Sequence, residues 1–288
     1  MWKNPIVRFG KSTFISHCVD EPVQVGHSLK SCTEEVALYS FNHETGVKVN
    51  LVDTPGFDDD NMSDLEVLRI LAGWLSVAYE NKIRLNGIIY LHRITDVRMQ
   101  GSGGRNLKLF QAMCGLEALS NVTLATTRWG EITEDLGTRR ERELEETPGY
   151  WGWMKQNGSR IERHYDTRDS ALRIIDIYLD FPRRVSLEIQ EELVVRKQQL
   201  EQTSAGREVA KDLLKQRNAA LGKLATAEKL MQGTGDHAIM MELERNKTEV
   251  DQQIHLLEQK QRELFRSSDW RQCYQRDLDI VQLQNLLL

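Results

Sequence analysis

The first two thirds of the chain alternate short apolar runs with longer stretches of helical periodicity. Strands are predicted at residues 36–41, 47–52, 87–92, 121–126 and 161–165, and helices at residues 64–81, 105–113, 133–145 and 169–178. This alternation is typical of a mostly parallel sheet with helices on both faces, so the expected fold class is α/β. In such sheets ligands bind beyond the carboxyl ends of the strands.

The last third of the chain has a different pattern. All five prolines lie at or before Pro182, and the sequence beyond it is rich in Glu, Gln, Lys, Arg and Leu. A turn at residues 233–236, with Asp236 as a candidate N-cap, predicts two long antiparallel helices. The second helix carries an apolar seam of heptad-like spacing, interrupted at Lys247 and Gln261, through Met240, Leu243, Val250, Ile254, Leu257 and Leu264.

These patterns predict two parts, an α/β domain at residues 1–182 and a helical hairpin or coiled-coil tail at residues 183–288. Two interpretations of the tail stay open. It either packs on the α/β domain or serves dimerisation or the capture of a partner, because fewer than four clean heptads are visible.

Composition narrows the class of protein. The chain has 288 residues and a formal net charge of −5, which argues against a nucleic-acid binder that depends on general electrostatics. The four cysteines are widely spaced, which predicts reduced thiols rather than a disulfide or zinc framework. No apolar run reaches the ~18 residues that a transmembrane segment needs, and no secretory leader pattern is present, so cytoplasmic localisation is expected.

The sequence Gly10-Lys11-Ser12-Thr13 has the pattern that ends a Walker A loop. In such a loop, backbone N–H groups at a helix start cradle phosphates, a lysine reaches the terminal phosphates, and a serine or threonine holds Mg²⁺. Lys11 and Ser12 suit these two roles, and Gly10 and Thr13 are expected to contact the same nucleotide.

A second motif follows about forty residues later, where the apolar run at residues 49–52 ends in Asp53-Thr54-Pro55-Gly56. A buried strand would carry Asp53 to the carboxyl edge of the sheet, where its carboxylate can hold the magnesium shell. Thr54 would lie beside it, and Gly56 can offer its N–H to the terminal phosphate. Each motif supplies what the other lacks, which predicts a nucleotide hydrolase or a nucleotide switch.

The segment before Gly10 departs from the motif. Pro5 stands where the motif has its first glycine, and residues 6–9 are bulkier than a phosphate loop usually allows. Only residues 1–4 precede Pro5, fewer than the strand of about five residues that should lead into the loop. Three explanations compete: a truncated or mispredicted start, which we favour, a degenerate relative that binds no nucleotide, or a makeshift strand at residues 6–9.

Thr33 lies between the two motifs. A threonine there suits a switch segment that meets Mg²⁺ and the terminal phosphate, although a lead-in to the next strand is the alternative. Phe57 stands where small G proteins place the glutamine that orients the attacking water, so slow hydrolysis is expected. Lys11, Thr33 and Gly56 are the residues predicted to act in hydrolysis.

The candidate base site is the stretch Thr127-Arg128-Trp129-Gly130. Guanine-specific domains end a strand with Asn or Thr, Lys, any residue and Asp, and that carboxylate accepts both guanine N–H groups. Thr127 and Arg128 fit this pattern loosely, whereas Gly130 replaces the aspartate. Trp129 either stacks on a purine or belongs to the core. Asp166-Thr167, after the last predicted strand, is a further candidate base-contact loop, and the choice between guanine and adenine stays open.

Together, these motifs resemble a group of fungal G-domain proteins, relatives of the septin and immunity-associated (paraseptin) GTPases. The residues that carry the resemblance are Gly10 to Ile15, Ser31 to Thr33, Asp53 to Asp59, Tyr90 to Asp96 and Thr127 to Trp129. The resemblance implies a P-loop GTPase of the TRAFAC class with GTP or GDP and Mg²⁺ as cofactors. It implies phosphate contacts from Lys11, Ser12 and Gly56, metal contacts from Ser12, Thr33 and Asp53, and G domains that pair face to face.

The leading hypothesis is a GTP-binding protein with a P-loop NTPase-like sheet, its first strand missing or makeshift. It would hydrolyse GTP slowly, and its tail would report the nucleotide state to a second copy or to an unidentified protein effector. The main alternative is a degenerate, non-catalytic G domain that acts as an interaction protein through the tail. An adenine-nucleotide hydrolase is the third hypothesis, because Gly130 is not an aspartate.

Overall fold

The computed structural model describes residues 10–19, 36–57, 62–96, 101–180, 183–233 and 236–265. The strands are β1 (Ala37–Asn42), β2 (Lys48–Asp53), β3 (Ile88–Arg93), β4 (Val122–Thr127) and β5 (Arg160–Arg163). The longer helices are α1 (Gly10–Cys18), α2 (Asp64–Glu80), α3 (Ser102–Cys114), α4 (Glu134–Glu146), α6 (Arg168–Asp180), α8 (Ser204–Gly233) and α9 (His237–Phe265). Short elements are η1 (Leu119–Asn121), η2 (Trp129–Glu131), η3 (Pro148–Gly152), α5 (Trp153–Gln156), α7 (Glu188–Gln190), η4 (Glu191–Val195) and η5 (Leu200–Gln202).

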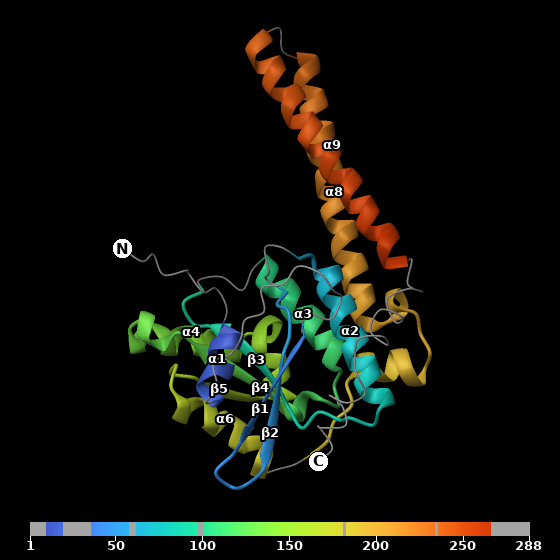
Figure 1. Cartoon of the computed structure of the whole chain (residues 1–288). Helices are drawn as coiled ribbons and strands as arrows, with labels where there is room; N and C mark the ends of the chain where they lie inside the picture. The colour runs from blue at the N-terminus through green and yellow to red at the C-terminus, as the bar shows by residue number, and fades with distance from the viewer. Residues whose placement is uncertain are drawn as a thin grey trace, which may run out of the picture.

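The predicted parallel sheet is confirmed for three strands, which lie in the order β3-β4-β5 (Figure 1). All six residues of the central strand β4 are buried. β1 and β2 differ from the expectation of one sheet, since among the described residues they form a separate antiparallel pair. A tight turn joins them, in which the His43 N–H donates to the Val47 carbonyl at 2.9 Å, and so short a connection permits only antiparallel pairing.

Helices cover both faces of the parallel sheet, as the alternation predicted. Ile88 and Tyr90 of β3 pack against the larger buried cluster, to which α2 and α3 contribute. The intervening residues Ile89 and Leu91 pack on the other side, against a smaller cluster that includes Phe14 of α1 and residues of α6. Successive side chains of a strand point to opposite faces, so the two clusters lie on opposite faces of the sheet.

Local sequence explains where α2 begins. Ser63 and Glu66 form a capping box, in which the Ser63 N–H donates to Glu66 Oε2 at 2.7 Å and the Glu66 N–H donates to Ser63 Oγ at 3.4 Å. Leu65, Leu68 and further residues at helical spacing are buried against the sheet. This helix starts at the residue where the prediction placed it.

The tail contains two long helices, α8 and α9, which pack against each other and project from the α/β part (Figure 1). Asp236 is the N-cap of α9, as predicted, since its Oδ1 accepts the Ala238 N–H at 2.8 Å. The predicted seam of α9 includes its only two buried side chains among the described residues, Leu257 and Leu264. A supercoiled geometry stays a prediction.

The base of the tail belongs to the core of the α/β part. Leu200, Val209 and Leu213 lie in the same buried cluster as residues of α2 and α3. The domain boundary at Pro182 stays a prediction, because residues 181–182 lie outside the described residues.

No helix of the described ranges combines the length and the apolar character needed to cross a bilayer.

Candidate functional site

The two sequence motifs meet at one point of the structure. Gly10 opens α1, Lys11 and Ser12 follow in its first turn, and Asp53 is the last residue of β2. Ser12 Oγ donates a hydrogen bond to Asp53 Oδ2 at 3.0 Å, across 41 residues of sequence. The structure therefore brings together the hydroxyl and the carboxylate that the sequence assigned to one site.

Burial shapes the charge at this site. It raises the pKa of Asp53, while the hydrogen bond from Ser12, the positive charge of Lys11 and the Thr54 N–H act in the opposite direction. The ionised carboxylate is thus costly where it stands, and a nearby cation would offset that cost.

The donor atoms fit Mg²⁺, which prefers hard oxygen ligands. Ser12 and Asp53 supply a hydroxyl and a carboxylate side by side. Within the described ranges no group of three or more His, Cys, Asp or Glu side chains could hold a metal ion. Mg²⁺ held by these two groups would complete its coordination shell with further oxygen ligands, such as water or phosphate. Thr33 and the segment before Gly10 lie outside the described residues.

The remaining predicted phosphate-side residues lie near this pair along the chain. Thr54 follows Asp53 directly, Gly56 follows two residues later, and both are half-buried. Thr13 lies in α1 one residue after Ser12, and its carbonyl accepts the Ser16 hydroxyl at 2.7 Å.

We expect Asp53→Asn to separate stability from binding. Because the pKa of Asp53 is raised in the folded state, the folded state loses stability as pH rises from the ordinary aspartate pKa through the raised pKa. At neutral pH, the uncharged amide of Asp53→Asn avoids this loss and should raise the melting temperature of the ligand-free chain. The same change should lower Mg²⁺-dependent nucleotide affinity at least about tenfold. Asp135→Asn, on the exposed start of α4, is the matched control for both measurements. A lower melting temperature for Asp53→Asn would contradict this account.

At the predicted base-contact stretch, β4 ends at Thr127 and the chain turns sharply. Thr127 is buried and its hydroxyl donates to the His92 carbonyl at 3.4 Å. Arg128 has a positive φ of 67°, and its guanidinium donates to Glu131 Oε1 at 2.6 Å. The Arg128 guanidinium, which is predicted to contact the base, is therefore paired with Glu131 in the described structure.

Trp129 packs in the core, which was the second of its two predicted alternatives. Its side chain is 5% exposed, and its indole N–H donates to Thr126 Oγ1 at 3.0 Å. The Arg163 guanidinium lies 4.1 Å from the centre of the ring. Gly137 of α4 makes room for the indole, since a Cβ there would approach it to 2.6 Å. The structure favours core packing over base stacking for this side chain.

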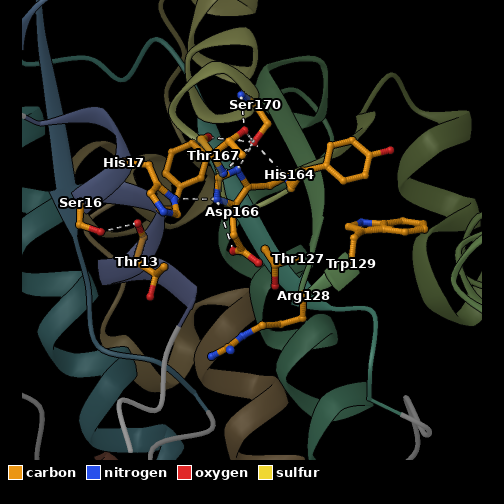
Figure 2. A network of polar contacts seen from close by, with 12 residues as sticks. Thr13, Ser16, His17, Thr127, Arg128, Trp129, His164, Asp166, Thr167 and Ser170 are labelled. Atoms are coloured by element: carbon orange, nitrogen blue, oxygen red, sulfur yellow. Dashed lines mark hydrogen bonds and ion pairs between the residues drawn. The ribbon is translucent and has the colours of Figure 1, made fainter. Parts of the chain in front are cut away.

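A polar cluster that the sequence did not reveal lies between the predicted phosphate-side residues of α1 and the predicted base-contact loops (Figure 2). His17 of α1 lies 3.2 Å from His164 Nε2 through its Nδ1, and Ser170 Oγ lies 2.9 Å from His164 Nδ1. Asp166, with a positive φ of 55°, places Oδ1 at 3.7 Å from His164 Nε2. The available signal was slight: His17 lies one helical turn after Thr13, and His164 directly follows β5.

We expect His164 to make the fold sensitive to acid. Burial, and then the charge of His17, lower its pKa from 6.5 to about 4, with Asp166 opposing them. The unfolded chain therefore binds the proton more readily, and stability should fall as pH drops from 6.5 toward about 4, by about 3 kcal/mol in total. Urea unfolding at several pH values measures this slope. His164→Gln should flatten it, whereas His255→Gln, in the exposed part of α9, should not. Equal slopes in all three proteins would contradict the assignment.

No family model matches the chain, and no curated protein matches it. Two crystal structures of Toc33 from Arabidopsis thaliana are similar to it in fold. A dimerization deficient mutant gives a TM-score of 0.47 at 14% identity, over 62% of this chain and 83% of that chain. Toc33 in complex with Mg²⁺ and GMPPNP gives a TM-score of 0.46 at 14% identity, over 62% of this chain and 82% of that chain. At this level of similarity, a functional assignment depends on the residues of this chain itself.

Proposed function

We propose that this chain is a GTP-binding protein, a slow GTPase that works as a nucleotide-controlled switch or assembly module. The observation that carries the proposal is the contact of Ser12 with Asp53 next to Lys11, at the first turn of a helix that starts beside a sheet edge. Helix starts attract anions, because their backbone N–H groups are unpaired and carry partial positive charge.

Each residue then has a role. Lys11 binds the terminal phosphates, and Ser12, Thr33 and Asp53 hold Mg²⁺, which when bound neutralises phosphate charge. Gly56 offers its N–H to the terminal phosphate. Phe57 packs against the larger core cluster and provides no amide to orient water, which is why hydrolysis is slow.

Asp166 supports guanine over adenine. The carboxylate is 38% exposed and lies in the loop after β5, and β5 is the parallel neighbour of β4, which leads to Thr127 and Arg128 (Figure 2). Guanine presents two adjacent N–H groups that a carboxylate can accept, and adenine does not. Asp166 therefore supplies from the next strand the acceptor that is missing at Gly130.

The test is titration of the full chain with a fluorescent GTP analogue, with Mg²⁺ and then with a chelator. We expect saturable, Mg²⁺-dependent binding that unlabelled GTP displaces and ATP does not. Asp166→Asn should reduce the preference for GTP over ATP, whereas Asp169→Asn, nearby on α6, should leave it unchanged. Displacement by ATP as effective as by GTP would indicate an adenine-nucleotide protein.

The alternative is a non-catalytic G domain that acts through its tail. The observation in its favour is the projecting pair α8 and α9, whose outer halves are largely exposed (Figure 1). A well-folded chain that binds neither nucleotide in the same titration would contradict the nucleotide switch and favour this alternative or an incomplete form of the protein.

A further inference from the structure

The outer part of the α8/α9 hairpin lacks a core of its own. No side chain of residues 221–233 or 236–256 is buried. Apolar side chains stand in solvent there instead, with Leu230 at 56%, Ile239 at 51% and Met241 at 58% exposure. In this two-helix hairpin these apolar side chains stay uncovered, and packing against further helices to form a bundle would bury them.

A groove runs along one face of this outer part. On α8 it is lined by small side chains and a lysine, among them Ala219, Gly222 and Lys223. On α9 it is lined by the polar side chains of Asn246, Glu249 and Gln253 and by the apolar ones of Leu243 and Val250. One wall is thus recessed and the other raised, so the groove has the relief to fit a helix pair like itself.

The two helices also differ in charge. α8 carries six basic and three acidic side chains, whereas α9 carries four basic and six acidic ones. Some of these charges pair within the hairpin, as Arg217 does with Glu258 at 2.9 Å. At the groove, Glu249 forms an ion pair with Arg245, an exposed residue one turn earlier on the same helix, at 3.4 Å. Lys223 on the opposite wall is exposed.

We propose that this groove is an interface with the same groove of a second copy, with the two hairpins parallel about a two-fold axis along their length. This symmetry places α8 against α9 of the partner, so that the recessed wall meets the raised one and Lys223 meets Glu249 of the partner subunit. A face-to-face antiparallel pair would instead set α8 on α8, basic helix on basic helix. The parallel pair closes a four-helix bundle and carries both α/β parts at the same end.

The charge pair gives a direct test by sedimentation of the full chain in a dilution series without nucleotide. We expect a monomer–dimer equilibrium for the native chain. Lys223→Glu and Glu249→Lys should each weaken association at least about tenfold, because each creates two like-charge contacts per dimer. An equimolar mixture of the two variants should associate as well as the native chain, because every contact is again between opposite charges.

Controls keep the result specific. Lys215→Glu and Glu242→Lys lie on the same two helices outside the groove lining and should leave association unchanged. Gly222→Leu tests the recessed wall, since a Cβ at this position meets nothing within 4 Å in the single chain; it should abolish association while helical circular dichroism is retained. A native chain that stays monomeric throughout, or a variant mixture that does not recover, would overturn the proposal. Neither result depends on nucleotide binding.

Discussion

Lys11→Ala is expected to weaken Mg²⁺-dependent GTP binding at least about a hundredfold. A phosphate-loop lysine is the main positive charge that the protein places on the terminal phosphates, and charge-assisted contacts of this kind are the strong ones. Lys11 lies one residue before Ser12, whose hydroxyl donates a hydrogen bond to Asp53. Replacing Lys11 with alanine therefore removes the lysine charge from the site and leaves the Ser12–Asp53 hydrogen bond in place. Equilibrium titration with the fluorescent analogue gives the affinity ratio directly.

The matched control is Lys48→Ala, at the exposed start of β2, which removes the same charge far from α1 along the chain. Its affinity should equal that of the native chain. If Lys11→Ala binds GTP as tightly as the native protein, the nucleotide lies elsewhere and the proposed site is wrong.

Arg163→Met is expected to destabilise the fold by about 3–5 kcal/mol, because it leaves a buried carboxylate without its partner. Arg163 Nε donates to Glu141 Oε2 at 2.8 Å, and the Glu141 side chain is only 9% exposed. The same carboxylate accepts the Thr126 hydroxyl at 3.2 Å. The guanidinium also covers the Trp129 ring, so this side chain of β5 contacts both α4 and η2.

Urea unfolding measures the loss. Arg196→Met removes an arginine from a more exposed ion pair with Glu188 and should cost much less stability, because exposed ion pairs contribute little. Replacing both partners, as Arg163→Met with Glu141→Leu, should recover much of the stability, because no buried charge is then left alone. If the Arg163 and Arg196 variants lost similar amounts of unfolding free energy, the buried Arg163–Glu141 ion pair would contribute no more to stability than the more exposed pair.

Most strands and long helices of this protein can be predicted from local sequence patterns. Apolar runs located β3 and β4 to within a residue at each end, and the helical stretch beginning at Asp64 located the start of α2. These signals are local, since strand and helix periods and caps involve residues a few positions apart. The pairing of Ser12 with Asp53 was also predictable, because a phosphate loop and the acidic end of a strand are two parts of one chemical requirement.

Other features depend on contacts between distant residues, which no local pattern specifies. Trp129 is buried because Gly137 and Arg163 happen to pack around it from other elements.

The sequence by itself indicated most strands and long helices, the common site of Ser12 and Asp53, and the seam along α9. Only the tertiary structure showed that His17 contacts His164, that the base of the tail packs in the α/β core, and that a groove lies on the outer part of the tail. The physical reason is that periodicity fixes which face of each element is apolar, whereas the partner of that face is chosen by packing among elements that lie far apart in the chain.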